Sequence, residues 1–216
     1  MVLESDSRKP GAKHRILDLY LRHGLDLPNT ATMALHLGRI DLLEAHLSGD
    51  PQLLRRTFTH EEIYPPDLGC HDQIQATQGT PLAGTTLLHL CVDYDEWEIA
   101  LWLLDHGMDP DAPATVDPDG FGGHTALFGT VVSQPNFWAT SSGEPGSARF
   151  AKLLLDRGAD PNRRASLRKQ LHPGYGDHRI GVYRDVTPLG WGRQFHGPAF
   201  VSAPTMALIA DRGGKE

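Results

Sequence analysis

Histidine is the residue that this chain offers most often for chemistry, with 12 copies among 216 residues. Six of them stand outside the apolar helical patterns of the sequence: His60, His71, His124, His172, His178 and His196. A metal site needs several converging ligands, often with a carboxylate among them. No two histidines have the His-x-x-x-His spacing that places both on one helix face. We therefore predict no metal site and no cofactor, and hydrogen-bonding roles in loops for these six side chains.

Motifs for covalent catalysis or phosphate binding are missing from the sequence. Gly-x-Ser-x-Gly, a Walker loop and Gly-x-Gly-x-x-Gly do not occur. Cys91 lies in an apolar helical run, which is typical of an inert core thiol. Gly-Phe-Gly-Gly at residues 120–123 is better explained as a hairpin turn than as a phosphate-binding loop. The motifs therefore favour a protein without enzymatic activity, without deciding the question.

The charge and composition of the chain narrow its partners and its location. The net charge is −7, which argues against a general binder of nucleic acids or anionic membranes. Two cysteines cannot form a disulfide framework, and the N-terminus lacks the apolar run of a signal peptide. No stretch approaches a membrane span. These features predict a cytoplasmic protein that binds neither nucleic acid nor membrane.

Four glycines mark the ends of repeated apolar helices. Eight, five and four residues before each glycine stand mostly apolar side chains, a spacing that traces one helix face. The four copies are Ile16, Leu19 and Tyr20 before Gly24; Ile99, Trp102 and Leu103 before Gly107; Phe150, Leu153 and Leu154 before Gly158; and Thr205, Leu208 and Ile209 before Gly213. Each glycine is expected just past the helix end, where a left-handed residue closes the last turn.

Threonines mark the start of an earlier helix in three of these units. Thr86, Thr125 and Thr187 each precede a short helical run, and a threonine hydroxyl can cap a helix N-terminus. Thr86 and Gly107 are 21 residues apart, which leaves room for two short antiparallel helices and a tight turn. The unit is therefore predicted to be a helix-turn-helix hairpin.

Thr86-Leu87-Leu88-His89, followed by helices that end Leu-Leu-Asp-His-Gly-Met-Asp-Pro and Leu-Leu-Leu-Asp-Arg-Gly-Ala-Asp-Pro-Asn, resembles the ankyrin repeat. The resemblance is to bacterial-type members with long insertions between repeats. It implies an all-α fold, an ankyrin-repeat solenoid of four to five helix-turn-helix repeats with extended finger loops. The expected organisation is an N-terminal tail at 1–12 and a single domain at 13–216, with repeats at about 13–28, 29–54, 86–111, 125–162 and 187–213.

The spacing departs from the ankyrin period of about 33 residues. Thr86 and Thr125 are 39 residues apart, and Thr125 and Thr187 are 62 apart. The surplus falls mainly into insertions at 55–85 and 163–186, with further insertions at 111–124, 133–147 and 195–203. By resemblance, the segments between repeats are finger-like hairpins along the concave side. We expect 163–186 to be an ordered finger in which Ile180–Tyr183 pairs as a strand.

The ankyrin register predicts which side chains face a partner. The first helix of one repeat should present Asp93, Tyr94 and Asp95 to the concave side, and the last repeat should present Arg193 and Phe195 with Trp191 nearby. Tryptophan, tyrosine and arginine are the usual hot-spot types of interfaces. The complete predicted binding set is Asp93, Tyr94, Asp95, His124, Trp138, Tyr183, Arg184, Trp191, Arg193 and Phe195.

Two functions from different classes fit these residues. The first is a protein–protein interaction module that binds a protein partner through its concave face and long fingers. The alternative is a small-molecule-binding or catalytic ankyrin protein, whose insertion loops close a pocket lined by histidines and aromatic residues. A deep pocket bordered by three inserted segments would favour the second function.

Overall fold

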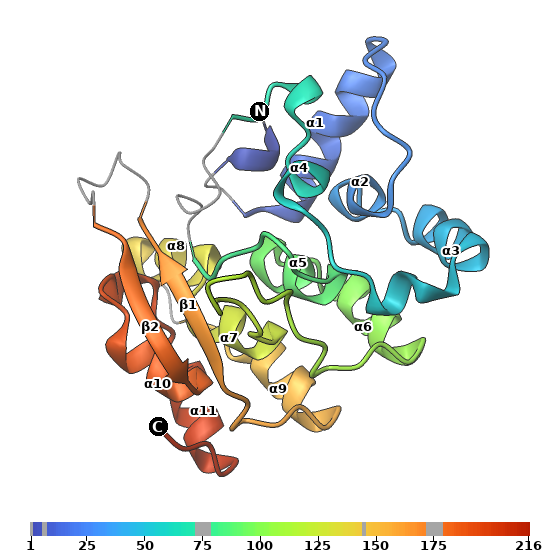
Figure 1. The fold of residues 1–216 in the computed structure, drawn as a ribbon. Coiled ribbons are helices and arrows are strands. Elements are labelled where there is room, and N and C mark those ends of the chain that lie inside the picture. Colours follow the sequence, from blue (N-terminus) through green and yellow to red (C-terminus); the bar gives the residue numbers. More distant parts are fainter. Residues whose placement is uncertain (1, 6–7, 72–78, 144–145, 172–178) are drawn as a thin grey trace.

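A computed structural model describes residues 2–5, 8–71, 79–143, 146–171 and 179–216 (Figure 1). Four antiparallel helical hairpins follow one another along the chain. They are α2 (Ala31–His36) with α3 (Ile40–Gly49), α5 (Leu87–Tyr94) with α6 (Trp97–Asp105), α7 (Ala126–Val131) with α9 (Arg149–Asp156), and α10 (Pro188–Gln194) with α11 (Ala203–Asp211). The first helices form one row, because α2 packs on α5, α5 on α7 and α7 on α10. Among the described helices, none has the length and apolarity needed to cross a membrane.

The landmarks that separate the helices have physical roles in the structure. Gly24, Gly107, Gly158 and Gly213 all have positive φ angles just after α1, α6, α9 and α11, as predicted. The threonine caps differ from one hairpin to the next. The Thr187 hydroxyl accepts a hydrogen bond from the Gly190 N–H at 3.1 Å, whereas Thr86 bonds instead to the His89 ring at 2.9 Å. The predicted cap at Thr125 is wrong, because that hydroxyl is buried without a hydrogen-bond partner.

Residues 1–12 were expected to be a tail, and the structure corrects this. Residues 2–4 form the short 3-10 helix η1 (Val2–Glu4), in which Leu3 is fully buried, and α1 (Pro10–Arg22) begins within the predicted tail. The apolar stripe of α1 differs from its three copies. Ile16, Leu19 and Tyr20 are exposed, because α1 has no first helix of its own to cover them. The stripe in the later hairpins is covered by their first helices.

The insertions fold onto the hairpins. Residues 51–68 form η2 (Pro51–Arg55), α4 (His60–Ile63) and η3 (Pro66–Leu68), and a capping box between Thr59 and Glu62 starts α4. The other two helical insertions are α8 (Gln134–Ser142) and η5 (Pro198–Phe200), which pack together through stacked Phe137 and Phe200 rings, 4.5 Å apart. The insertions therefore add a second set of elements around the row of hairpins.

The prediction of an all-α fold is wrong for the finger at 163–186. There, β1 (Ala165–Lys169) and β2 (Gly181–Val186) pair in an antiparallel two-stranded sheet, with Leu167 opposite Tyr183 and Arg168 opposite Val182. Leu167 and Tyr183 are buried, whereas Val182 is exposed. This alternation places one face of the sheet on the hairpins and the other in solvent. Figure 1 shows β2 beside α10, and these two elements are in contact.

Candidate functional site

Extended segments from successive fingers are hydrogen-bonded into one continuous ribbon. The N–H of Phe58 donates to the Thr85 carbonyl, the N–H of Gly84 to the Phe58 carbonyl and the N–H of Thr115 to the Gly84 carbonyl, each at 2.8 Å. Gly122 and Ser166 then exchange two backbone hydrogen bonds, which join the hairpin at 114–124 to β1. The turn of this hairpin lies at 117–120, where the Gly120 N–H donates to the Asp117 carbonyl at 2.9 Å, and residues 121–123 form the returning arm, so the turn predicted at 120–123 is misplaced. The ribbon thus links three insertions that are far apart in the sequence.

The ribbon borders a cleft of about 360 Å³, which we call the finger cleft. Its walls come from residues 81–83, from the hairpin at 115–124 and from β1, so each wall is an inserted segment. The lining residues are Pro81, Ala83, Thr115, Asp117, Phe121, Gly122, His124, Ser166, Leu167 and Arg168. A cleft of this size, with apolar walls and a few polar groups, can hold either a small molecule or an anchoring side chain of a protein.

The guanidinium groups of two arginines lie over the Phe121 ring at the edge of the finger cleft. Arg184 lies 3.9 Å and Arg168 4.3 Å from the centre of the Phe121 ring. Arg168 also pairs with Asp117 and, at 2.9 Å, with Asp119. The N–H of Phe121 donates to the Asp117 carboxylate at 2.9 Å, and this bond together with Arg168 keeps the pKa of Asp117 below its usual value. The group is therefore a fixed array of balanced charges on an aromatic ring.

His124 lies at the floor of the finger cleft and was predicted as a binding residue. Its Nε2–H donates to the Pro81 carbonyl at 2.9 Å, and its own carbonyl accepts from His89 Nε2 at 3.0 Å. Burial lowers the pKa of His124 to about 4 and, with the neighbouring His124, lowers the pKa of His89 to about 3. Both rings are neutral near pH 7, so they tie adjacent fingers together and are not poised for proton transfer.

The His89–His124 pair gives a prediction about acid stability. The folded protein keeps both rings neutral, whereas the unfolded chain protonates them below about pH 6.5. The contribution of the two neutral rings to the free energy of unfolding is therefore fully present above that pH. It is lost as the pH falls towards the pKa values of the folded protein, about 4 for His124 and about 3 for His89. When the pH is lowered from 7 to 5, the free energy of unfolding should fall in both the wild type and His89→Gln. The fall should be about 2 kcal/mol smaller in the variant, whose glutamine can still bond to Thr86 and His124 but cannot be protonated. Urea unfolding at both pH values measures this difference.

The matched control for that experiment is His106→Gln, because His106 lies on the exposed end of α6. It should show the same loss of stability on acidification as the wild type. An equal loss in the His89 variant would contradict the assignment of the acid sensitivity to the buried pair.

The predicted concave helix face is covered in the structure, which corrects the expected exposure of several residues. Only 3% of Asp93, 2% of Tyr94 and none of Trp191 is exposed. The other predicted residues that prove to be buried are His124, Tyr183 and Phe195. The ankyrin register did not indicate this burial, because the N-terminal residues and the insertions of the chain cover these side chains.

The Trp191 side chain is covered by the insertion at 55–85 and by aromatic side chains of the last repeat and β2. Its indole N–H donates to the Thr80 hydroxyl at 3.1 Å, so the insertion at 55–85 reaches across to α10. Tyr183 of β2 and Phe195 pack edge-on against its ring with centroid distances of 4.7 and 4.8 Å. The aromatic side chains of the last repeat are thus a core cluster and not a free surface.

Asp93 and Tyr94 are covered by the N-terminal residues. Arg8 Nε donates to Asp93 Oδ2 at 3.0 Å, and the Tyr94 hydroxyl donates to the Leu3 carbonyl at 2.7 Å. Lys169, at the end of β1, is also fully buried in this region, and burial lowers its pKa to about 7 in spite of the Asp93 carboxylate. No local pattern indicates this cluster, because Arg8 and Leu3 lie more than 80 residues from Asp93 and Tyr94 in the sequence.

The members of the predicted set that are not buried fall in separate places. Asp95 and Trp138 line one groove of about 360 Å³ together with Lys9, and 43% of Trp138 is exposed. Arg184 lies at the finger cleft, whereas Arg193 pairs with Glu216 at 2.6 Å near the C-terminus. The structure therefore places Asp95 and Trp138 in one groove. It places His124 in the finger cleft, whose lining residue Phe121 contacts Arg184. The ten predicted residues do not form a single site.

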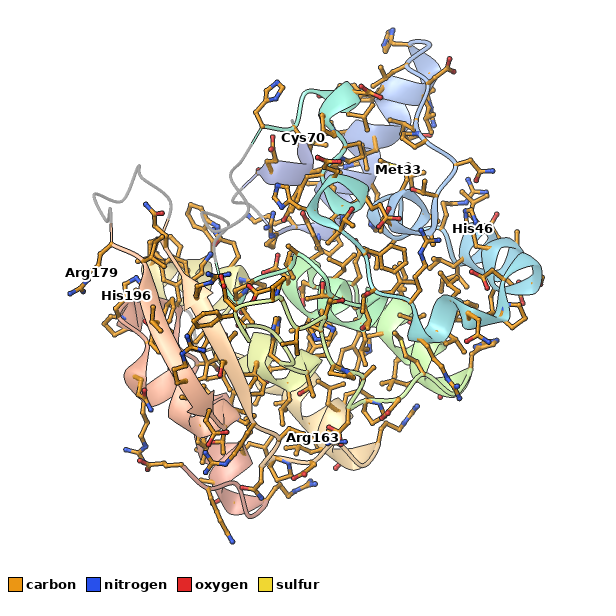
Figure 2. All side chains as sticks on the ribbon, viewed as in Figure 1. Met33, His46, Cys70, Arg163, Arg179 and His196 are labelled. Atoms are coloured by element: carbon orange, nitrogen blue, oxygen red, sulfur yellow. The ribbon has the colours of Figure 1, made fainter. Side chains whose placement is uncertain are left out.

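Sequence reasoning missed Asp117, Phe121 and Arg168 as a group. Arg163, Arg164, Arg168 and Lys169 form a basic run in the sequence, for which solvated side chains at the base of the finger are the simplest interpretation. Arg163, labelled in Figure 2 where α9 leads into β1, does lie at the surface and pairs with Asp111 at 3.7 Å. Arg168 instead pairs within the cleft, and Lys169 is buried. Successive side chains of a strand point to opposite faces of its sheet, so a strand predicted at β1 would have placed Arg168 and Lys169 on different faces.

In the described residues, no three side chains of His, Cys, Asp or Glu come close enough to hold a metal ion.

Part of the chain is similar to a known protein family. Residues 83–114 match the family model for the ankyrin repeat, and this stretch contains α5, α6 and the start of the next finger. No curated protein sequence matches the chain. The match confirms the resemblance of Thr86–His89 and the following helix to the ankyrin repeat, whereas the resemblance to bacterial-type members stays a prediction.

Proposed function

We propose that this ankyrin-repeat protein is a protein–protein interaction module whose partner docks across the finger cleft. Ankyrin repeats generally mediate protein–protein interaction, and solenoids of this kind offer long binding surfaces rather than a common chemistry. We further propose that the helical hairpins are four to five repeats of one solenoid, with the boundaries expected from the sequence. The insertions at 55–85 and 163–186 are then its binding fingers.

The observation that carries this proposal is the exposed surface beside the finger cleft, where Val182 lies opposite the lining residue Arg168. Val116 and Val182, on the hairpin and on β2, are 57% and 56% exposed. They accompany Arg168 and Arg184, whose guanidinium groups lie on Phe121. Arginine and aromatic side chains flanking apolar ones are the usual composition of an interface centre. The ribbon of backbone hydrogen bonds holds these groups in place, which reduces the entropy cost of binding.

An apolar-to-acid substitution tests the location of the binding surface. Val182→Asp should weaken a captured protein partner at least ~10-fold, because an uncompensated carboxylate is placed in the interface. Stability should change little, because the side chain already lies in solvent. Partners retained by the wild-type and variant proteins are compared by quantitative mass spectrometry, and the affinity of a purified partner is then measured by calorimetry.

Leu25→Asp is the matched control, since Leu25 is also an exposed apolar residue but follows α1 at the far end of the row. It should bind the partner like the wild type. If Leu25→Asp abolishes binding and Val182→Asp does not, the partner docks on α1 and the proposal is wrong.

One observation favours a second candidate function, the binding of a small molecule. All three walls of the finger cleft come from insertions, and the lining includes His124 and Phe121. Ala83→Phe would fill the cleft from within while leaving Val182 and Arg184 at its exterior. Loss of ligand-induced thermal stabilisation in this variant, with protein binding unchanged, would support the small molecule; the opposite pattern would support the protein partner. The cytoplasmic location and the roles of Asp95, Trp138 and Arg193 in binding stay predictions.

A further inference from the structure

Residues 2–5 and 8–9, which we call the latch, lie against the C-terminal end of α5, at Asp93 and Tyr94. Leu3 is fully buried, and its carbonyl accepts the hydrogen bond from the Tyr94 hydroxyl. Glu4 accepts a hydrogen bond from the N–H of His71 at 2.5 Å. Arg8 reaches Asp93 at the end of α5. The latch therefore lies where the ankyrin register led us to expect a partner.

Arg8 is held by a set of groups suited to a guanidinium. Its Nε donates to the Asp93 carboxylate at 3.0 Å, and its plane lies 4.2 Å from the centre of the Tyr94 ring. A second nitrogen donates to the Ser5 carbonyl at 2.7 Å, so the side chain also organises the segment that carries it. A lysine could not make these planar and branched contacts at once. We call Asp93 and Tyr94 the arginine cradle.

The contacts of the latch can be exchanged for those of another chain. A buried ion pair contributes little net stability, because the cost of removing both charges from water offsets their attraction. The hydrogen bonds to Tyr94 and His71 involve only backbone or carboxylate oxygens of the latch, which any extended segment or water can supply. Leu3 is the only fully buried apolar side chain among the described latch residues. A partner that brings an apolar side chain and an arginine would therefore replace the burial of Leu3 and the contacts of Arg8 with Asp93 and Tyr94.

We propose that the arginine cradle recognises an extended, arginine-bearing segment of a partner protein, and that the latch is its resident occupant, which the partner displaces. The chain carries a net charge of −7, which favours the approach of a basic segment. The surface is separate from the finger cleft, so this inference does not depend on the docking site proposed above. The latch would keep the cradle closed against weak or non-specific basic segments.

The test uses the full chain and a synthetic peptide with the sequence of residues 2–10, labelled with a fluorophore. Arg8→Ala weakens the resident latch but leaves the cradle intact, so this variant should bind the peptide at least ~10-fold more tightly than the wild type. Adding Asp93→Ala should remove that gain, and so should replacing arginine by lysine in the peptide. Lys9→Ala is the matched control, because Lys9 is exposed, and it should bind the peptide like the wild type. Fluorescence anisotropy gives the dissociation constants.

Failure of the folded Arg8→Ala variant to bind more tightly than the wild type would overturn the proposal, since the cradle would then be an ordinary part of the core. Should Arg8→Ala not fold, hydrogen exchange in the wild type decides. The latch amides should then exchange through a local opening, at least ~10-fold faster than the protected amides of α5. Exchange of both sets only through global unfolding would show that the latch cannot be displaced. Val182→Asp should not affect either measurement, which separates this test from that of the finger cleft.

Discussion

Trp191→Ala should lower the free energy of unfolding by about 3–5 kcal/mol, which is the usual cost of deleting a large buried aromatic side chain. Trp191 has no exposed surface, packs edge-on against Tyr183 and Phe195, and donates a hydrogen bond to Thr80. The substitution would leave a cavity between α10, β2 and the insertion at 55–85. Urea unfolding of the variant and wild-type proteins at pH 7 measures the loss.

Trp191→Phe is the control for the cavity. It keeps an aromatic ring but removes the N–H donor, so its loss should be smaller, and the difference between the variants reports the packing contribution. An unchanged unfolding midpoint for Trp191→Ala would mean that the side chain lies on an open surface. That is the result expected from the repeat register alone, so the experiment decides between the register and the tertiary packing.

Gly122→Ala should lower the free energy of unfolding by about 3 kcal/mol or more, because backbone strain and a backbone clash act together. The φ angle of Gly122 is +119°, and an added Cβ atom would lie 2.0 Å from the carbonyl oxygen of Thr115. Neither group can move without breaking the hairpin at 114–124 or its hydrogen bonds to Ser166. Urea unfolding, with the amide spectrum of the finger as a local probe, measures the effect.

Gly158→Ala is the matched control for this substitution. Gly158 also has a positive φ angle, +93°, but no atom lies within 4 Å of the position of an added Cβ. Its cost should be that of left-handed strain alone, about 1 kcal/mol. If the two alanine variants lose the same stability, the close approach of Gly122 to Thr115 is not present in the protein and the finger cleft has another shape.

The sequence alone determined the local structure of the helical hairpins. An apolar stripe at helical spacing buries one face of each second helix, and a glycine that can adopt a positive φ angle ends it; both rules act within about ten residues. They located the ends of α6, α9 and α11, and they led to the ankyrin resemblance that the match at 83–114 confirms. The strand predicted at Ile180–Tyr183 overlaps β2, which begins one residue later and continues to Val186, because alternation along a strand is a local pattern.

The tertiary structure decided which faces remain accessible. Burial of Asp93, Tyr94 and Trp191 depends on Arg8, Leu3 and Thr80, which come from segments without a repeat and whose long-range contacts no local pattern encodes. The same holds for the finger cleft, where Phe121 meets Arg168 and Arg184 only because backbone hydrogen bonds align three insertions of different length. A repeat fixes the spacing between neighbouring helices, since each contacts mainly the next. It does not fix where the inserted segments fold back, because those contacts join residues that are distant in the sequence.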